Sequence, residues 1–207
     1  MAKILLVVAH PALEKSRNNI RLMKAAASVD QVQIRDLYEL YPRFYINTQK
    51  EQEYLEQHDV IILQHPFYWY SIPALMKQYL DTVFTHGWAY GKGVNKLKDK
   101  IIFNAITTSG TRESYSEEEH NRFPLASYLV PVNQLAFVCK MRYLPPFVMH
   151  ESGKADASAS SLHAKHFKTL LRMFSNNDFD PEALKALEYL NDHNLDTDTT
   201  ATPVYKT

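Results

Sequence analysis

The chain has 207 residues, 45% of them hydrophobic and 22% charged, which is ordinary for a globular protein. Its 23 basic and 23 acidic residues cancel, which excludes nucleic acid or an anionic membrane as a bulk electrostatic partner. Cys139 is the lone cysteine, so an intramolecular disulfide and a cysteine metal cage are also excluded. With no signal-peptide cleavage pattern and no apolar run near the ~20 residues of a membrane helix, we expect a cytoplasmic protein.

The first part of the chain alternates strands with helices. Three apolar runs predict strands, at residues 4–9, 32–37 and 59–64. Helical spacing follows the first strand, over residues 20–27. Thr48-Gln-Lys-Glu51 is interpreted as a capping box that opens a helix ending near Gln57. The first and third strands each end at a His-Pro pair, since proline cannot donate to a sheet ladder.

An aromatic stretch follows the third strand. Phe67, Tyr68, Trp69 and Tyr70 come directly after Pro66, and a helical pattern then runs to about Val83. Ser71 is the expected cap of that helix, with Pro73 in its first turn. A turn has difficulty burying four consecutive large side chains, so we interpret them as the lining of a pocket for a flat ring. Ordinary core packing is the alternative.

The second part of the chain continues the alternation. Residues 86–95, which contain three of the five glycines, are expected to form a long functional loop. A strand at 100–107 leads into a polar loop as far as Arg122, and Pro124 opens a helix to about Val138. The next strand, 141–148, contains Pro145-Pro146 and is therefore expected at an edge or interrupted. Ser161 is the expected cap of the helix that follows.

Strands alternating with helices over about 175 residues predict a three-layer α/β domain with a parallel sheet. Residues 176–207 are expected to form an extension, with one short helix after Asp180-Pro181 and a disordered tail from Asp196 onward. The predicted division is therefore 1–175 and 176–207.

Loops follow three of the predicted strands, at residues 10–19, 65–70 and 107–115. Because carboxyl ends of parallel strands share one rim of a sheet, these loops converge. The first opens a helix and suits a phosphate, the second is aromatic, and the third offers small polar groups for the edge of a ring. The pattern indicates a mononucleotide cofactor.

Other classes of site lack their motifs. The sequence contains no G-x-G-x-x-G after the first strand, no P-loop and no G-x-S-x-G elbow. His163 and His166 are one helical turn apart but have no third ligand near them in the sequence, so we interpret them as a solvated helix face and predict no metal site.

Several segments carry a family pattern. They are A-H-P with residues 16–19, D-L-Y-E-L-Y-P at 36–42, Q-H-P-F-Y-W-Y-S-I-P-A-L-M-K at 64–77, D-T-V-F-T-H-G-W-A-Y-G at 81–91, T-T-S-G at 107–110 and L-P-P-F-V-M-H at 144–150. On these segments, residues 4 to about 175 resemble the flavodoxin-like NAD(P)H:quinone oxidoreductases. Within that family the resemblance is to the ancillary subunits of glutathione-regulated potassium efflux antiporters.

The resemblance implies a flavodoxin-like three-layer sandwich with a five-stranded parallel sheet, non-covalent FMN in residues 1–175, and a homodimer. It assigns cofactor binding to His10, Ser16, Arg17, Asn18, Asn19, Pro66, Phe67, Tyr68, Trp69, Tyr70, Thr107, Thr108, Ser109 and Gly110. The family usually has glycine where Ser109 stands, so serine would be strained there if the position requires a positive φ. His65 is expected to order its loop.

The resemblance also implies a two-electron ping-pong reaction in which NADPH or NADH reduces the flavin and a quinone-like acceptor then takes the electrons. Tyr115 and His120 match positions proposed to assist proton transfer in the quinone reductases, although a solvated role in their charged loop is an equal alternative. Trp88 and Tyr90 either cover the cofactor from a partner subunit or pack beneath their own loop.

A second function class follows from the same resemblance. The antiporter-associated relatives are regulatory subunits that dock on the cytosolic domain of a potassium efflux antiporter. A chain of this kind would be cytoplasmic and held at the inner face of the membrane by its partner. Residues 176–207 are the candidate docking segment.

Overall fold

The computed structural model describes residues 1–94 and 96–193 and has a parallel sheet at its centre. The strands run in the order β2-β1-β3-β4-β5, and β6 also pairs with β4. Every pairing is parallel. The strands are β1 (Ile4–Val8), β2 (Val32–Asp36), β3 (Val60–Pro66), β4 (Ile101–Thr107), β5 (Arg142–Tyr143) and β6 (Phe147–Met149).

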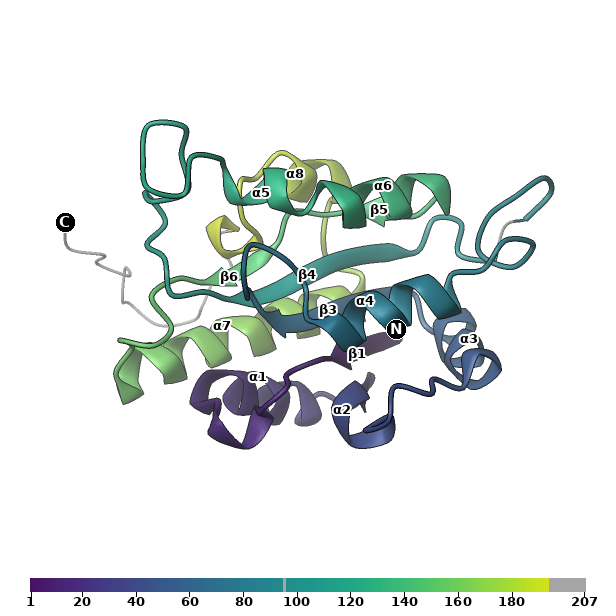
Figure 1. The fold of residues 1–207 in the computed structure, drawn as a ribbon, viewed down its shortest axis with the longest axis horizontal. Coiled ribbons are helices and arrows are strands. Elements are labelled where there is room, and N and C mark those ends of the chain that lie inside the picture. The colour runs from purple at the N-terminus through teal and green to yellow at the C-terminus, as the bar shows by residue number, and fades with distance from the viewer. Residues whose placement is uncertain (95, 194–207) are drawn as a thin grey trace.

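Helices cover both faces of this sheet (Figure 1). The α-helices are α1 (Arg17–Ala27), α2 (Leu37–Leu40), α3 (Thr48–Gln57), α4 (Ala74–Val83), α5 (Leu125–Tyr128), α6 (Val130–Val138), α7 (Ala157–Asn176) and α8 (Pro181–Lys185), with 3-10 turns at η1 (Leu13–Lys15) and η2 (Leu190–Asp192). The prediction of a three-layer α/β sandwich with a parallel sheet is confirmed. Among the described residues, none of the helices combines the length and apolar character needed to cross a membrane.

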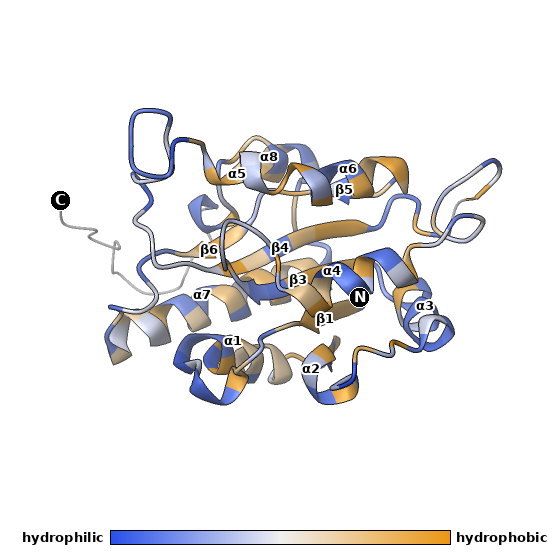
Figure 2. Cartoon of the chain, in the orientation of Figure 1, coloured by the Kyte–Doolittle hydropathy of each residue, from blue (hydrophilic) through white to orange (hydrophobic). Residues whose placement is uncertain are grey.

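The strand residues alternate between two hydrophobic cores. In β1, Ile4, Leu6 and Val8 belong to the core on the α1 and α7 side. Leu5 and Val7 belong to the core that includes α4 and α6. Both faces are therefore covered, which explains the near-continuous apolar strands seen in Figure 2. Each such side chain contributes about 1.5–3 kcal/mol to folding through its burial.

The end of β3 differs from the prediction. His65 and Pro66 lie inside the strand, and Pro66 is paired in register with Thr107 of β4. The expectation that Pro66 stops the strand was therefore wrong by two residues. The pairing of β1 with β3 ends at Gln64, so the N–H group that proline lacks removes no bond from that ladder.

The caps of three helices also differ. Asn47, rather than Thr48, caps α3 and accepts from the Lys50 N–H at 3.0 Å. Asp156, rather than Ser161, caps α7 and accepts from the Ala159 N–H at 2.7 Å, so this helix begins earlier than predicted. Pro73, rather than Ser71, is the N-cap residue of α4, and no side chain caps this helix.

Two prolines explain two further breaks. The predicted helix 124–138 is divided into α5 and α6 at Leu129, because Pro131 lacks the N–H that a continuous helix requires. The predicted strand 141–148 is interrupted at Pro145-Pro146 into β5 and β6, as expected.

The segment after α7 packs against the domain. Leu184 of α8 and Leu190 of η2 are fully buried in the same core as β1. The predicted division at residue 175 stays a prediction. The disordered tail expected from Asp196 onward lies outside the described residues.

Candidate functional site

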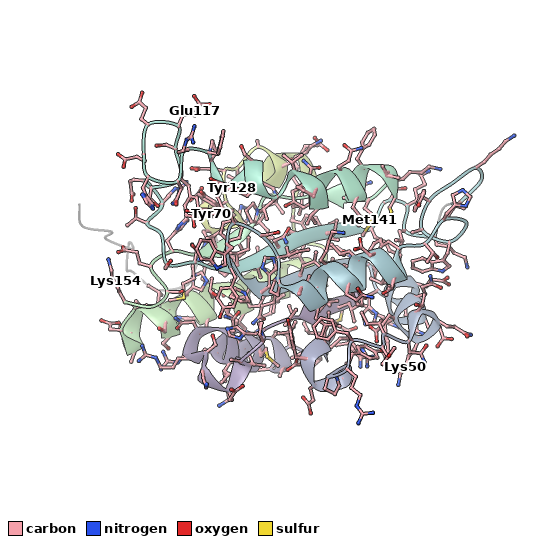
Figure 3. The ribbon with its side chains drawn as sticks, in the orientation of Figure 1. Lys50, Tyr70, Glu117, Tyr128, Met141 and Lys154 are labelled. Carbon is pink, nitrogen blue, oxygen red and sulfur yellow. The ribbon has the colours of Figure 1, made fainter. Side chains whose placement is uncertain are left out.

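Four loops gather at the carboxyl ends of the strands, following β1, β3, β4 and β6. The chain passes from β1 to β2 on one side and then to β3 on the other, which makes the β1/β3 boundary the topological switch point where α/β proteins bind ligands. Figure 3 shows Tyr70, Glu117 and Lys154 at this end of the molecule and Met141 at the opposite end.

The first loop delivers the start of α1. Ser16 is the N-cap, so Arg17, Asn18 and Asn19 form the first helical turn instead of lying in a loop. In the described part of the chain, the backbone N–H groups of Arg17 and Asn18 have no hydrogen-bond acceptor. Free amides, the positive end of the helix dipole and the exposed Arg17 side chain fit an anionic group such as a phosphate.

Asn18 and Asn19 are both buried but differ in how their polar atoms are used. The Asn19 Nδ2 atom donates to Ser16 Oγ at 3.0 Å and to Thr107 Oγ1 at 2.9 Å. Gln64 Nε2 donates to the Asn19 backbone oxygen and to its Oδ1 atom, at 3.0 and 3.2 Å. Asn19 thus ties α1 to the ends of β3 and β4.

Asn18 instead leaves an acceptor unused. Its Nδ2 atom donates to the Ser152 carbonyl at 2.7 Å. Its Oδ1 atom is buried without a hydrogen-bond partner among the described residues. Because buried polar atoms are nearly always paired, a hydroxyl donor of a bound ligand is the natural partner for this oxygen.

His10 stands beside the aromatic loop. Its Nδ1 atom accepts from the Ala12 N–H at 3.1 Å, so Nε2 carries the ring proton and is a donor. Burial lowers the pKa of His10, and the nearby Glu14 carboxylate opposes this shift in part. The ring meets Tyr68 edge-on at 5.9 Å between centroids.

The aromatic loop divides between core and surface. Phe67 is buried and packs on Tyr115 and Tyr128. Tyr68 and Tyr70 are partly exposed, and Trp69 is 92% exposed. The core alternative therefore applies to Phe67 alone among the four.

The backbone of this loop is strained. Trp69 and Tyr70 have φ values of 48° and 62°, a region that costs a non-glycine residue on the order of 1–3 kcal/mol. Tyr70 is held there by stacking on Tyr128 at 5.1 Å and by a hydrogen bond to Asn121 Oδ1 at 3.2 Å. Strain that presents exposed aromatic rings beside a helix N-terminus is typical of a ligand site.

The loop after β4 closes on itself. Thr108 Oγ1 and the Tyr115 hydroxyl are 2.6 Å apart, and the Gly110 N–H donates to Thr108 Oγ1 at 3.3 Å. A Cβ atom at Gly110 would lie 2.9 Å from both Ser114 Oγ and Tyr115 Cε2, so glycine is required there by close approach. Ser109 is exposed and is not among the residues with positive φ, so serine fits without backbone strain.

Tyr115 and His120 lie in different environments. Tyr115 is buried, and burial raises the pKa of its phenol. His120 is exposed. No hydrogen bond or ring contact joins the two within the described ranges. The histidine beside Tyr115 is His150, with ring centroids 6.0 Å apart.

The fourth loop, after β6, was not anticipated. The Glu151 and Ser152 N–H groups donate to the carbonyls of Gly110 and Thr108, at 3.1 and 2.8 Å. Together with the Asn18 contact to Ser152, they connect this loop to two others of the site. The carboxyl end of β6 follows the same rule as the other strand ends, but Pro145-Pro146 interrupts the apolar run and hides this strand end in the sequence.

His65 and Trp88 take part in contacts away from the loops. His65 is fully buried, with Nε2 3.0 Å from Asn104 Nδ2 and Nδ1 2.9 Å from the Pro66 carbonyl oxygen. Burial lowers its pKa to about 4. Trp88 donates to Glu56 Oε1 at 2.7 Å and packs against the core that includes α4 and α6. Its loop precedes β4 and lies at the opposite end of the sheet (Figure 1).

The interpretation of His163 and His166 as a solvated helix face was wrong. His163 stacks on Phe147 at 4.5 Å, and His166 meets the same ring edge-on at 5.5 Å. Burial lowers the pKa of His163 to about 3. Among the described residues, no group of three or more histidine, cysteine or acidic side chains is arranged to hold a metal ion.

Comparisons with known proteins agree with this geometry. The model of a protein family with a flavodoxin-like fold matches residues 2–171. The glutathione-regulated potassium-efflux system ancillary protein KefF of Enterobacter sp. strain 638 is 40% identical over 168 residues, which cover 81% of this chain and 94% of the relative.

Two solved structures are also similar. General stress protein 14 of Treponema denticola, solved in complex with FMN, has a TM-score of 0.78 at 31% identity and covers 82% of this chain and 98% of its own. An NADPH-quinone reductase from P. pentosaceus has a TM-score of 0.74 at 28% identity, covering 81% of this chain and 96% of its own.

Proposed function

The chain belongs to the family with a flavodoxin-like fold whose model matches residues 2–171, and on that premise we propose that it is an FMN-dependent oxidoreductase that uses NAD(P)H to reduce a quinone-like acceptor. The observation that carries the proposal is the start of α1, where two free backbone amides and the unpaired Asn18 Oδ1 stand beside an exposed aromatic loop. This combination accepts a phosphate, a hydroxylated chain and a flat ring.

The residues proposed to hold FMN come from three loops. Ser16, Arg17 and Asn18 would take the phosphate and its hydroxylated chain, with His10 as a further donor through Nε2. Tyr68, Trp69 and Tyr70 would face the ring system, supported from beneath by Pro66 and Phe67. Asn19 and Thr107 hold these loops together, and Thr108, Ser109 and Gly110 supply small groups at the edge of the ring.

When bound, FMN supplies hydride transfer, from NADPH or NADH and on to the acceptor. The chain positions the reacting rings and excludes water from them. In the 108–110 loop, the candidate for stabilising negative charge that develops at the polar edge of the ring is the Ser109 N–H, because the N–H groups of Thr108 and Gly110 already donate to the Met149 carbonyl and to Thr108 Oγ1. We propose Tyr115 and His120 as the residues that assist proton transfer, and the Tyr115 hydroxyl is already oriented by Thr108.

The test is FMN binding by the purified chain, followed by fluorescence titration of apoprotein. Arg17→Ala removes an exposed cation beside the free amides and should weaken FMN binding about tenfold, equivalent to about 1.4 kcal/mol. Arg21→Ala, one turn further along α1, is the matched control and should bind FMN as the wild type does. The proposal would be overturned if the wild-type protein is colourless after incubation with excess FMN and removal of the unbound FMN.

A homodimer is part of the proposed function. Val130, Phe137 and Val138 of α6 are 56%, 74% and 43% exposed, which is unusual for adjacent apolar side chains on one helix. A second copy is the proposed cover for this surface. Any cover that Trp88 and Tyr90 give the cofactor would come from a partner subunit, because in its own chain the segment 86–94 lies at the opposite end of the sheet (Figure 1).

The second candidate function is regulation of a potassium efflux antiporter, favoured by the 40% identity to KefF over 94% of that relative. The chain would then be a cytoplasmic protein held at the inner face of the membrane by the antiporter's cytosolic domain. Co-sedimentation with membranes that contain or lack the antiporter tests this role. Equal sedimentation in the two preparations would reject it.

A further inference from the structure

Residues 188–193, here called the C-terminal clamp, contact two loops of the candidate site from outside the family match, which ends at residue 171. The clamp includes η2 and crosses the edge of the sheet beside β6. The clamp makes three kinds of contact: an arginine–carboxylate ion pair, aromatic ring contacts, and hydrogen bonds to the backbone of β6.

The first contact is to the loop after β4. Arg112 Nη1 and Nη2 donate to the two carboxylate oxygens of Asp192 at 2.7 and 2.8 Å, and Nη2 also pairs with Glu188. The same guanidinium lies 4.6 Å over the Tyr189 ring. A bidentate arginine–carboxylate pair fixes both distance and orientation, which a single lysine cannot do.

The second contact completes the exposed edge of β6. The Val148 N–H donates to Asn191 Oδ1 at 2.7 Å, and Asn191 Nδ2 donates to the Val148 carbonyl at 3.0 Å. The side-chain amide thereby takes the place of a neighbouring strand. The Leu190 N–H adds a bond to the Pro146 carbonyl at 3.0 Å. Directly beyond β6 is the loop whose Ser152 binds Asn18.

The third contact lies between these two. Tyr189 is 3% exposed and belongs to the hydrophobic cluster that contains Phe67, Tyr115 and Val148. Its ring meets His150 edge-on at 5.3 Å. The clamp is thus hydrogen-bonded to the loop after β4 and to strand β6, and it meets the loop after β6 through the contact between the Tyr189 and His150 rings.

We propose that the clamp sets the spacing between the loops after β4 and β6, with Arg112 and Asn191 as positioning residues for the ligand that the site takes. The identity of that ligand as FMN rests on the proposed function. The clamp itself rests on contacts within this chain. Removing either side chain should allow the two loops to move apart, which would weaken the binding of a ligand between them.

The experiment compares the wild-type full chain with Arg112→Gln and Asn191→Leu by hydrogen exchange of the apoprotein and by FMN titration. Arg142→Gln is the matched control, since Arg142 is also exposed and paired with one carboxylate, Asp99, at 3.9 Å. Amides in 108–122 and 149–156 should exchange about tenfold faster in both variants, with β3 unchanged. FMN should bind about fivefold more weakly, and Arg112→Lys should restore part of the loss.

Two results would overturn the clamp. The first is hydrogen exchange in these loops at the wild-type rate in Arg112→Gln. This variant alone is sufficient for the test if Asn191→Leu fails to fold. Acceleration spread evenly over the whole sheet would show a general loss of stability instead of positioning. If the wild type binds no FMN, the proposed function fails, but the exchange rates of the apoprotein still decide the clamp.

Discussion

Adjacent residues at the start of α1 have different physical tasks. Arg17 is exposed, Asn18 keeps one buried acceptor unpaired, and Asn19 uses its polar atoms to join α1 to β3 and β4. Mutations in this short stretch should therefore separate ligand binding from stability. The three residues are consecutive in the sequence, but they contribute differently to the free energy of folding and to ligand binding.

Asn19→Ala should lower the free energy of unfolding of the apoprotein by about 2–3 kcal/mol, because it removes the buried side-chain bonds to Gln64 and Thr107 and leaves Thr107 Oγ1 without its donor, although Gln64 Nε2 keeps its bond to the backbone oxygen of residue 19. Asn18→Ala should cost about 1 kcal/mol, since it removes one hydrogen bond and an already unpaired oxygen. Urea denaturation measures both. Equal losses in the two variants would contradict the assignment of Asn19 to the connection between strands.

Buried neutral histidines should make the chain sensitive to acid. Burial lowers the folded-state pKa of His65 and His163 from 6.5 to about 4 and about 3, so the unfolded chain binds more protons between these values. Stability is therefore complete above pH 6.5 and falls as the pH is lowered toward 4. The slope is about 1.4 kcal/mol per pH unit for each group.

His163→Phe keeps a ring against Phe147 and removes one of the two titrating groups. Its unfolding free energy, measured by denaturant titration at several pH values, should fall less steeply between pH 6 and 4 than that of the wild type. A slope identical to the wild type would show that His163 takes up its proton at the same pH in the folded and unfolded states, so that its burial makes no contribution to the acid sensitivity.

Residue types and strand ends were sufficient to predict three loops of the site, but they could not assign tasks within a loop. Nothing in the letters F-Y-W-Y distinguishes the buried Phe67 from the 92% exposed Trp69, because that depends on where the turn places each side chain. His150 was missed for a related reason. Its neighbours Tyr115 and Tyr189 come from distant parts of the chain.

At the scale of elements, the central strands were predictable because burial on both faces leaves a continuous apolar signal. The caps were less so. Thr48 and Glu51 fit a capping box, yet Asn47 lies one residue earlier and Glu51 is fully buried in an ion pair with Arg35 of β2. A partner from a distant strand thus changed a local pattern that was otherwise consistent.

The loop after β4 depends on the close approach of its own segments at Gly110. Gly110→Ala should lower the free energy of unfolding by about 1–3 kcal/mol, because its Cβ would lie 2.9 Å from the buried Tyr115 ring. Gly153→Ala is the control, since nothing lies within 4 Å of its Cβ position and its φ is not positive. Thermal unfolding of the apoproteins measures both. A neutral Gly110→Ala would show that the loop can open.

At the scale of the whole molecule, the two faces of the sheet are covered unequally. The core beneath α1 and α7 is extended by α8 and η2, which bury Leu184 and Leu190. On the other side, α6 buries Val132 and Ala136 but leaves Phe137 exposed. Periodicity alone could not reveal this, because α6 is apolar on both of its faces and looks like a buried helix.

The exposed face of α6 leads to a prediction about assembly. Wild-type protein should be a dimer by light scattering, and Phe137→Asp should weaken the dimer about a hundredfold, because it would place a carboxylate in a desolvated interface. Leu162→Asp on α7 is the control, as Leu162 is 55% exposed on a different helix, and it should remain dimeric. Both variants should keep the thermal stability of the folded domain. A monomeric wild type, or dissociation of the Leu162 variant alone, would show that this face of α6 is not where two copies meet.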